Sequence, residues 1–219
     1  MQINRTQLKW IAVITMVIDH IGVIFFPEAW WMRAIGRVSF PVFSYCLVEG
    51  FIHTSDRKRY FGRLMLLALL SEIPFDMAIY GTYYEPSHQN IFFTLAMGLL
   101  LLEIMERFAT RPMNQMFALA GLVLCMVFLK ASYGIGGLLI IFTFYLMLVR
   151  GQEKTAWMLF AVINICFFTG YLQAFALLCI FPIKLYNGTA GQKSGRFFYW
   201  IYPLHLLILW VIAKYMGIR

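Results

Sequence analysis

Long apolar segments, separated by short polar stretches, recur along the whole chain. Their length, roughly 15–22 residues, is close to the ~20 residues that an α-helix needs to cross the hydrocarbon core of a bilayer. Only Gly170 and Tyr171 separate the seventh segment from the eighth, so eight spans with a re-entrant segment are an alternative. The pattern predicts an all-α, polytopic membrane helical bundle of about nine transmembrane helices, at approximately 8–26, 34–53, 60–80, 89–108, 112–129, 133–149, 155–170, 172–187 and 197–216.

The Lys and Arg residues between these segments set the predicted orientation, because cytoplasmic loops carry an excess of both. With the N-terminus inside, 13 of the 18 Lys and Arg residues fall on the inner side and 4 on the outer side, with Arg37 set aside as intramembrane. We therefore predict an N-terminus inside and a C-terminus outside. No long polar linker divides the chain, so residues 1–219 are predicted to form a single transmembrane domain.

The composition supports the membrane class and narrows the function. The chain is 62% hydrophobic and 13% charged, whereas about 25% of the residues of a soluble domain are charged. The net charge of +8 is distributed over short loops, which argues against a nucleic-acid-binding face. The four cysteines are far apart within apolar segments, and no Cys or His spacing indicates a metal site.

Among the ionisable residues inside the first three predicted spans are His20, Arg37 and Glu72. A charged side chain at the bilayer centre costs about 3 kcal/mol on insertion scales, so residues of this kind usually mark a functional site. The predicted topology places His20 towards the outer end of the first span and Arg37 about one helical turn below the outer surface. It places Glu72 just past the midplane.

Further polar residues are expected at overlapping depth, on the third, fourth and last spans: Asp76, Asn90, Tyr202 and His205. One alternative is that they only hydrogen-bond neighbouring helices. Another is that Arg37 pairs with Glu72 or Asp76 and locks the bundle. Asp19 precedes His20 but points about 100° away on a helix, so it need not be its partner. The whole set favours a functional pocket.

The residue types in this set limit the chemistry. A histidine facing a carboxylate in a dry pocket can act as a general base, and a buried arginine can stabilise developing negative charge. The sequence has no zinc signature, Walker loop or Gly-x-Ser-x-Gly motif. Proton abstraction with group transfer and proton-coupled transport both fit the residues.

Five motifs carry a resemblance that spans nearly the whole chain. They are Asp-His-Ile-Gly at 19–22, Gly-Arg-Val-Ser-Phe-Pro at 36–41, Ser-Glu-Ile-Pro-Phe-Asp at 71–76, Gln-Asn-Ile-Phe-Phe-Thr at 89–94 and Tyr-Pro-Leu-His-Leu at 202–206. Their order resembles the TraX family, named for the conjugation protein that N-acetylates F-type pilin, and similar to a branch of the transmembrane acyltransferases. One departure is Ser132, where an acidic residue would be expected before Tyr133 and Gly134.

The resemblance implies a bacterial inner-membrane, multi-pass acetyltransferase. By this resemblance, the protein would take the acetyl group from cytoplasmic acetyl-CoA and pass it to an amine or hydroxyl of a peptide or glycan acceptor at the outer side. His20 would be the catalytic histidine and Arg37 would lie near the thioester, with His205 as the competing base. Glu72 and Asp76 would orient the imidazole or pair with Arg37, while Asn90 and Tyr202 would donate hydrogen bonds to the oxyanion. Four inner-side residues would meet the coenzyme phosphates: Arg57, Lys58, Arg59 and Arg63.

Two other classes of function fit parts of the sequence. A proton-coupled carrier or exporter would use the same His, Arg and carboxylate residues as a relay, although no internal repeat supports one. A non-catalytic membrane subunit of a secretion or conjugation apparatus would not need the buried polar cluster. We therefore expect acetyl transfer, with the carrier as its alternative.

Overall fold

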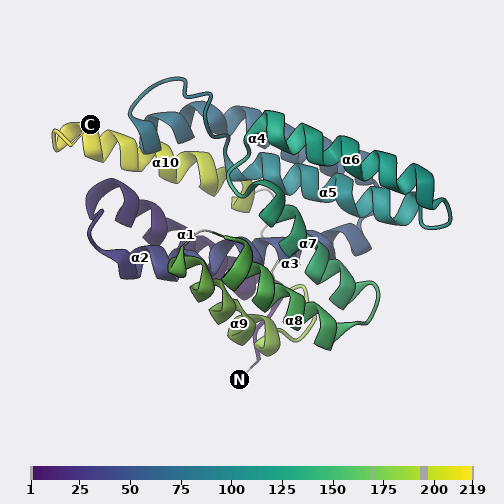
Figure 1. The fold of residues 1–219 in the computed structure, drawn as a ribbon. Coiled ribbons are helices and arrows are strands. Elements are labelled where there is room, and N and C mark those ends of the chain that lie inside the picture. The colour runs from purple at the N-terminus through teal and green to yellow at the C-terminus, as the bar shows by residue number, and fades with distance from the viewer. Residues whose placement is uncertain (1, 169, 193–196, 219) are drawn as a thin grey trace. The chain divides into compact units, whose positions relative to one another are not determined.

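A computed structural model describes residues 2–168, 170–192 and 197–218, and every regular element in these ranges is helical (Figure 1). Two isolated backbone bridges, Ile3 with Tyr186 and Gln89 with Ala131, join loops. The predicted all-α class is confirmed for this part of the chain. The helices are α1 (Arg5–Phe25), α2 (Trp30–Gly36), α3 (Ser39–His53), α4 (Arg57–Tyr80), α5 (Ile91–Arg107), α6 (Pro112–Leu129), α7 (Gly134–Leu148), α8 (Glu153–Val162), π-helical η1 (Ile163–Phe167), 3₁₀-helical η2 (Tyr171–Cys179), α9 (Ile180–Leu185) and α10 (Phe197–Tyr215).

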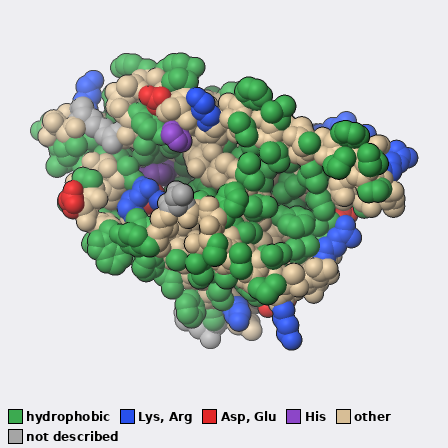
Figure 2. All heavy atoms as spheres, in the orientation of Figure 1, with side chains coloured by type: hydrophobic (Ala, Val, Ile, Leu, Met, Phe, Trp, Pro, Cys, Tyr) green, Lys and Arg blue, Asp and Glu red, His purple; other side chains and the backbone are tan. Residues whose placement is uncertain are grey.

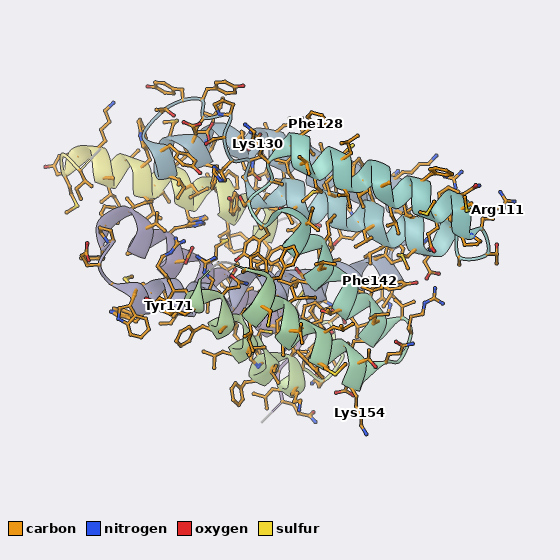
Figure 3. The ribbon with its side chains drawn as sticks, in the orientation of Figure 1. Arg111, Phe128, Lys130, Phe142, Lys154 and Tyr171 are labelled. Atoms are coloured by element: carbon orange, nitrogen blue, oxygen red, sulfur yellow. The ribbon has the colours of Figure 1, made fainter. Side chains whose placement is uncertain are left out.

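Four helical stretches in the described residues are long and apolar enough to cross a membrane: Arg5–Phe25, Trp30–His53, Pro112–Leu129 and Phe197–Tyr215. In Figure 3, the charged residues Arg111 and Lys130 lie at opposite ends of the apolar helix α6, and Phe128 points away from the helix. Phe128 is 76% exposed, as expected of a side chain that faces lipid rather than a protein core. Figure 2 likewise shows hydrophobic side chains spread over much of the drawn surface, with Lys and Arg in small groups. The chain therefore has the apolar helices of a membrane protein.

The second of these stretches is broken shortly before a proline, Pro41. The helix α2 ends at Gly36, the backbone turns at Arg37 and Val38, and α3 begins at Ser39. Pro41 stands in the first turn of α3, has no N–H, and would clash with the carbonyl four residues earlier, which belongs to Arg37. The break therefore falls at the Gly-Arg motif itself.

The chain divides into two compact units. The first comprises Met1–Cys46, Leu70–Glu85 and Asn164–Arg219, and the second comprises Leu47–Leu69 and Pro86–Ile163. In the second unit, α5 packs against α6 and α7. Gly98 allows this approach, because a Cβ there would collide with the side chain of Ile141 on α7.

In the first unit, α1 packs against both α2 and α10. A Cβ at Gly22 would stand 2.8 Å from Cβ of Met32, so α1 and α2 approach closely as an antiparallel pair. Trp10 near the start of α1 contacts Phe198 at the start of α10, with ring centroids 5.3 Å apart. The two helices α1 and α10 therefore run parallel, and residues near their C-terminal halves come level with each other.

Candidate functional site

Two histidines meet between α1 and α10 in the first unit. Nδ1 of His20 lies 2.7 Å from Nε2 of His205, which is hydrogen-bonding distance. The other ring nitrogen of His205, Nδ1, lies 2.8 Å from the backbone carbonyl of Ile201, one turn earlier on α10. The sequence predicted both histidines as alternatives for one role, and the structure brings them into direct contact.

Tyr202 completes this contact from α10. Its ring centroid lies 6.1 Å from that of His20 and 5.6 Å from that of His205, edge-on in both cases. The tyrosine is 4% exposed. The tyrosine therefore lies beside both imidazoles, and its predicted role as a hydrogen-bond donor to an oxyanion stays a prediction.

An ion pair that the sequence did not predict lies between α1 and α2. Nη1 of Arg33 is 3.4 Å from Oδ2 of Asp19, with 31% and 18% of the two side chains exposed. The sequence places Arg33 only among the four outer-side charges and gives Asp19 no partner. No local spacing predicts this ion pair, because its two residues lie on different helices.

Arg37 lies at the level of this ion pair. It caps the C-terminus of α2, and its N–H lies 3.2 Å from the carbonyl of Arg33. The preceding residue, Gly36, touches the side chain of Asp19 on α1. Within the described residues, the buried Nε of Arg37 makes no hydrogen bond. A buried guanidinium donor without a hydrogen bond is costly, which makes this nitrogen a candidate donor to a substrate.

Gly36 has no room for a side chain. A Cβ at this position would overlap the carboxylate of Asp19, so Gly36→Ala must displace either the ion pair or the helix. We expect a loss of about 1–3 kcal/mol in the free energy of unfolding, as for other overpacked cores, seen as a lower melting temperature in detergent. Gly62→Ala is the matched control, since a Cβ there meets nothing within 4 Å. Equal stability of the two variants would contradict this packing.

The two carboxylates predicted on α4 lie around Pro74, inside the helix. Asp76 is 1% exposed, and its Oδ2 accepts a hydrogen bond of 2.9 Å from the N–H of Glu85. This contact ties the loop after α4 to the helix. Glu72 lies one turn earlier with Oε1 buried. The proposed roles of both residues towards His20 or Arg37 stay predictions.

Asn90 belongs to the second unit and has a clear structural role there. Its side-chain oxygen accepts a hydrogen bond of 3.0 Å from the N–H of Phe92, and so caps the N-terminus of α5. Its amide nitrogen donates to the carbonyl of Ala68 on α4, at 2.7 Å. Asn90 is fully buried. Its predicted role as an oxyanion donor stays a prediction.

The four basic residues predicted to bind coenzyme phosphates lie at the start of α4, also in the second unit. Arg57 pairs with Glu103 at 3.0 Å and lies over the ring of Phe51. Arg59 pairs with Asp56 at 3.5 Å. In the described residues, Lys58 and Arg63 are exposed and have no carboxylate partner, so these two are the cations most available to a phosphate.

The fold and the site together define a helical membrane protein with a half-buried histidine pair. Residues 4–213 match the sequence model of a family described as TraX protein. The chain therefore belongs to the TraX family, and the resemblance inferred from its motifs is confirmed.

Curated relatives extend this result. The chain is 28% identical to "Probable fimbrial assembly protein FimC, serogroup H1" of Dichelobacter nodosus, over 93% of each chain. It is also 28% identical to "Protein TraX" of Escherichia coli, over 96% of this chain and 87% of the relative. No solved structure matches the chain significantly. The name of the Dichelobacter relative refers to fimbrial assembly.

Proposed function

We propose that the protein is a membrane acetyltransferase that moves the acetyl group of acetyl-CoA to an amine or hydroxyl of an acceptor at the outer side. The observation that carries this proposal is the contact of 2.7 Å between His20 and His205. A half-buried imidazole held in place by a second group can act as a general base or nucleophile. Arg37, on a helix packed against the one that carries His20, supplies a buried donor.

The reaction can be written with residues of the first unit. His20 takes the proton from the acceptor N–H or O–H, the acceptor nitrogen or oxygen bonds the acetyl carbon, and the C–S bond breaks. CoA leaves as the thiolate while His20 holds the proton, and the proton then passes from His20 to the sulfur. Alternatively, His20 first accepts the acetyl group itself and then passes it on. Arg37 stabilises the oxyanion that forms at the acetyl carbonyl in either route.

The acceptor side of the proposal rests on topology and on the relatives. Parallel α1 and α10 agree with a nine-span, multi-pass arrangement in which the first and last spans both run outward. The name of the Dichelobacter relative contains the words "fimbrial assembly". A pilin-like peptide amine is therefore the first acceptor to test, followed by a surface glycan hydroxyl, in a bacterial inner membrane.

A proton-coupled carrier is the second candidate, and one observation favours it. The chain has interrupted helices at α2–α3 and at the π-helical η1 followed by 3₁₀-helical η2. Discontinuous helices commonly form substrate and ion sites in transporters. The same His, Arg and carboxylate residues would then relay protons, and acetyl-CoA would not be a ligand.

Binding of acetyl-CoA separates these two candidates. A ligand that binds only the folded protein stabilises it by about 2.7 kcal/mol at 100 times its dissociation constant. We expect acetyl-CoA to raise the melting temperature of the purified protein by several degrees, and free CoA to compete. No shift at millimolar acetyl-CoA would favour the carrier.

Lys58 and Arg63 should contribute to this binding. Because neither has a carboxylate partner in the described residues, each can contact a coenzyme phosphate without breaking an ion pair. We expect Lys58→Gln and Arg63→Gln each to raise the dissociation constant of acetyl-CoA about 3- to 10-fold, measured by calorimetry, and more so at low salt. The control is Lys154→Gln, which removes another exposed cation and should leave the constant unchanged. Equal effects of all three changes would indicate net charge alone.

A further inference from the structure

The hydrogen bonds of His205 determine where its proton lies. Its Nδ1 is 2.8 Å from the backbone carbonyl of Ile201, and a carbonyl oxygen only accepts hydrogen bonds. Nδ1 of His205 must therefore carry the hydrogen. In the neutral ring, Nε2 then bears the lone pair, so His205 presents an acceptor to His20.

The geometry between the two rings is that of a direct, nearly linear hydrogen bond. The ring centroids are 5.0 Å apart, close to the largest separation that a nitrogen–nitrogen distance of 2.7 Å allows. Both nitrogens therefore lie near the line that joins the two centroids. The ring planes differ by 21°, so the lone pair of one ring points along the N–H of the other.

From these contacts we propose that His205 is a positioning residue that holds neutral His20 in its Nδ1–H form. Nε2 of His20 is then the nitrogen with the lone pair, facing away from His205. The role of this nitrogen in acetyl transfer rests on the proposed function. The position of the proton on Nδ1 of His20 does not.

The tautomer decides whether His20 can act. With the hydrogen on Nε2 instead, the same nitrogen would donate a hydrogen bond and could neither take a proton nor attack the acetyl carbon. In the serine-protease triad, the wrong histidine tautomer lowers kcat by about 10⁴-fold. In this protein the neutral His205 fixes the tautomer of His20, as the aspartate of the triad fixes the tautomer of its histidine. Both members of the pair begin uncharged, which suits helices that cross a membrane, where a buried carboxylate is costly.

The reaction also gains a place for the transferred proton. When Nε2 of His20 takes the acceptor's proton, its Nδ1–H can shift towards Nε2 of His205. The positive charge is then shared between two rings, and the shift reverses when the proton passes to the sulfur of CoA. No further reactant is needed.

Nitrogen NMR on ¹⁵N-histidine-labelled protein tests the tautomer without any substrate. The chain has four histidines, so His53→Gln with His88→Gln leaves only the pair. At a pH where both rings are neutral, we expect Nδ1 of each to show a directly bonded hydrogen and Nε2 to show none. His205→Gln should keep this state of His20, since an amide oxygen can accept the same hydrogen bond, whereas His205→Leu should shift His20 towards Nε2–H. An Nε2–H form of His20 in the parent, or an unchanged tautomer in His205→Leu, would overturn the proposal.

Activity provides the second measurement. His205→Leu should lower kcat by about 10²–10⁴-fold with little change in the KM for acetyl-CoA, and His205→Gln should recover much of that loss. Equal losses in both variants, with the tautomer preserved in His205→Gln, would make His205 itself the reacting base and contradict a positioning role. If the tautomers behave as expected but the parent transfers no acetyl group, the proposed function fails and the position of the proton stands.

Discussion

Replacing His20 with glutamine should lower the rate of acetyl transfer by about 10²–10⁴-fold, because the change removes the base or nucleophile from the reaction. Glutamine preserves the size and polarity of the side chain and can still contact His205 through its amide, so the two helices should stay packed. The measurement is release of the CoA thiol together with acetylation of a pilin-like peptide, by purified protein in nanodiscs.

The controls for His20 are histidines outside the site. His53 lies at the end of α3 and His88 in the loop before α5, and both are exposed. His53→Gln and His88→Gln should therefore keep the parent rate. The melting temperature of His20→Gln should stay close to that of the parent. Full activity in His20→Ala together with loss in His205→Ala would exchange the roles of the two residues.

Replacing Arg37 with glutamine should lower kcat by about 10²–10³-fold, as the loss of one oxyanion donor does in other acyl-transfer enzymes. Its buried Nε has no hydrogen bond in the described residues, so the group is available to a substrate oxygen. The KM for acetyl-CoA should change little, because the interaction forms in the transition state. Steady-state kinetics in nanodiscs separate the two constants.

Two further variants sharpen the Arg37 prediction. Arg37→Lys keeps the charge but loses the planar donor geometry, so it should recover only part of the activity. Lys214→Gln removes a cation that is exposed on α10 and should have no effect. If Arg37→Gln instead raised KM and left kcat unchanged, Arg37 would bind the coenzyme and the oxyanion role would be wrong.

The sequence predicted the helices well because each depends on a local pattern. The predicted apolar segments are largely helical in the described residues, although only four helical stretches there are long and apolar enough to cross a membrane. Two local details differ from the prediction. Residues 34–53 were expected as one span but break before Ser39, and Asn90, expected inside a span, caps the helix that begins at Ile91. These features require no knowledge of which helices touch.

The pairing of side chains was less accessible, because it depends on tertiary contacts. His20 and His205 are 185 residues apart, and nothing in their spacing shows that α1 and α10 pack in parallel. The sequence therefore predicts two histidines that compete for one role, whereas in the structure they form a pair in direct contact. The ion pair of Asp19 with Arg33 was missed for the same reason, since its partners lie on different helices.

The central claim is tested most directly with [¹⁴C]acetyl-CoA added to inverted inner-membrane vesicles from cells that make the protein. The cytoplasmic face of such vesicles is outermost, and the native acceptors are enclosed. We expect the label to become bound to enclosed peptide or glycan, with one CoA thiol released per acetyl group, and both signals to be lost in His20→Gln vesicles. Intact acetyl-CoA, with parent and His20→Gln vesicles indistinguishable, would contradict it.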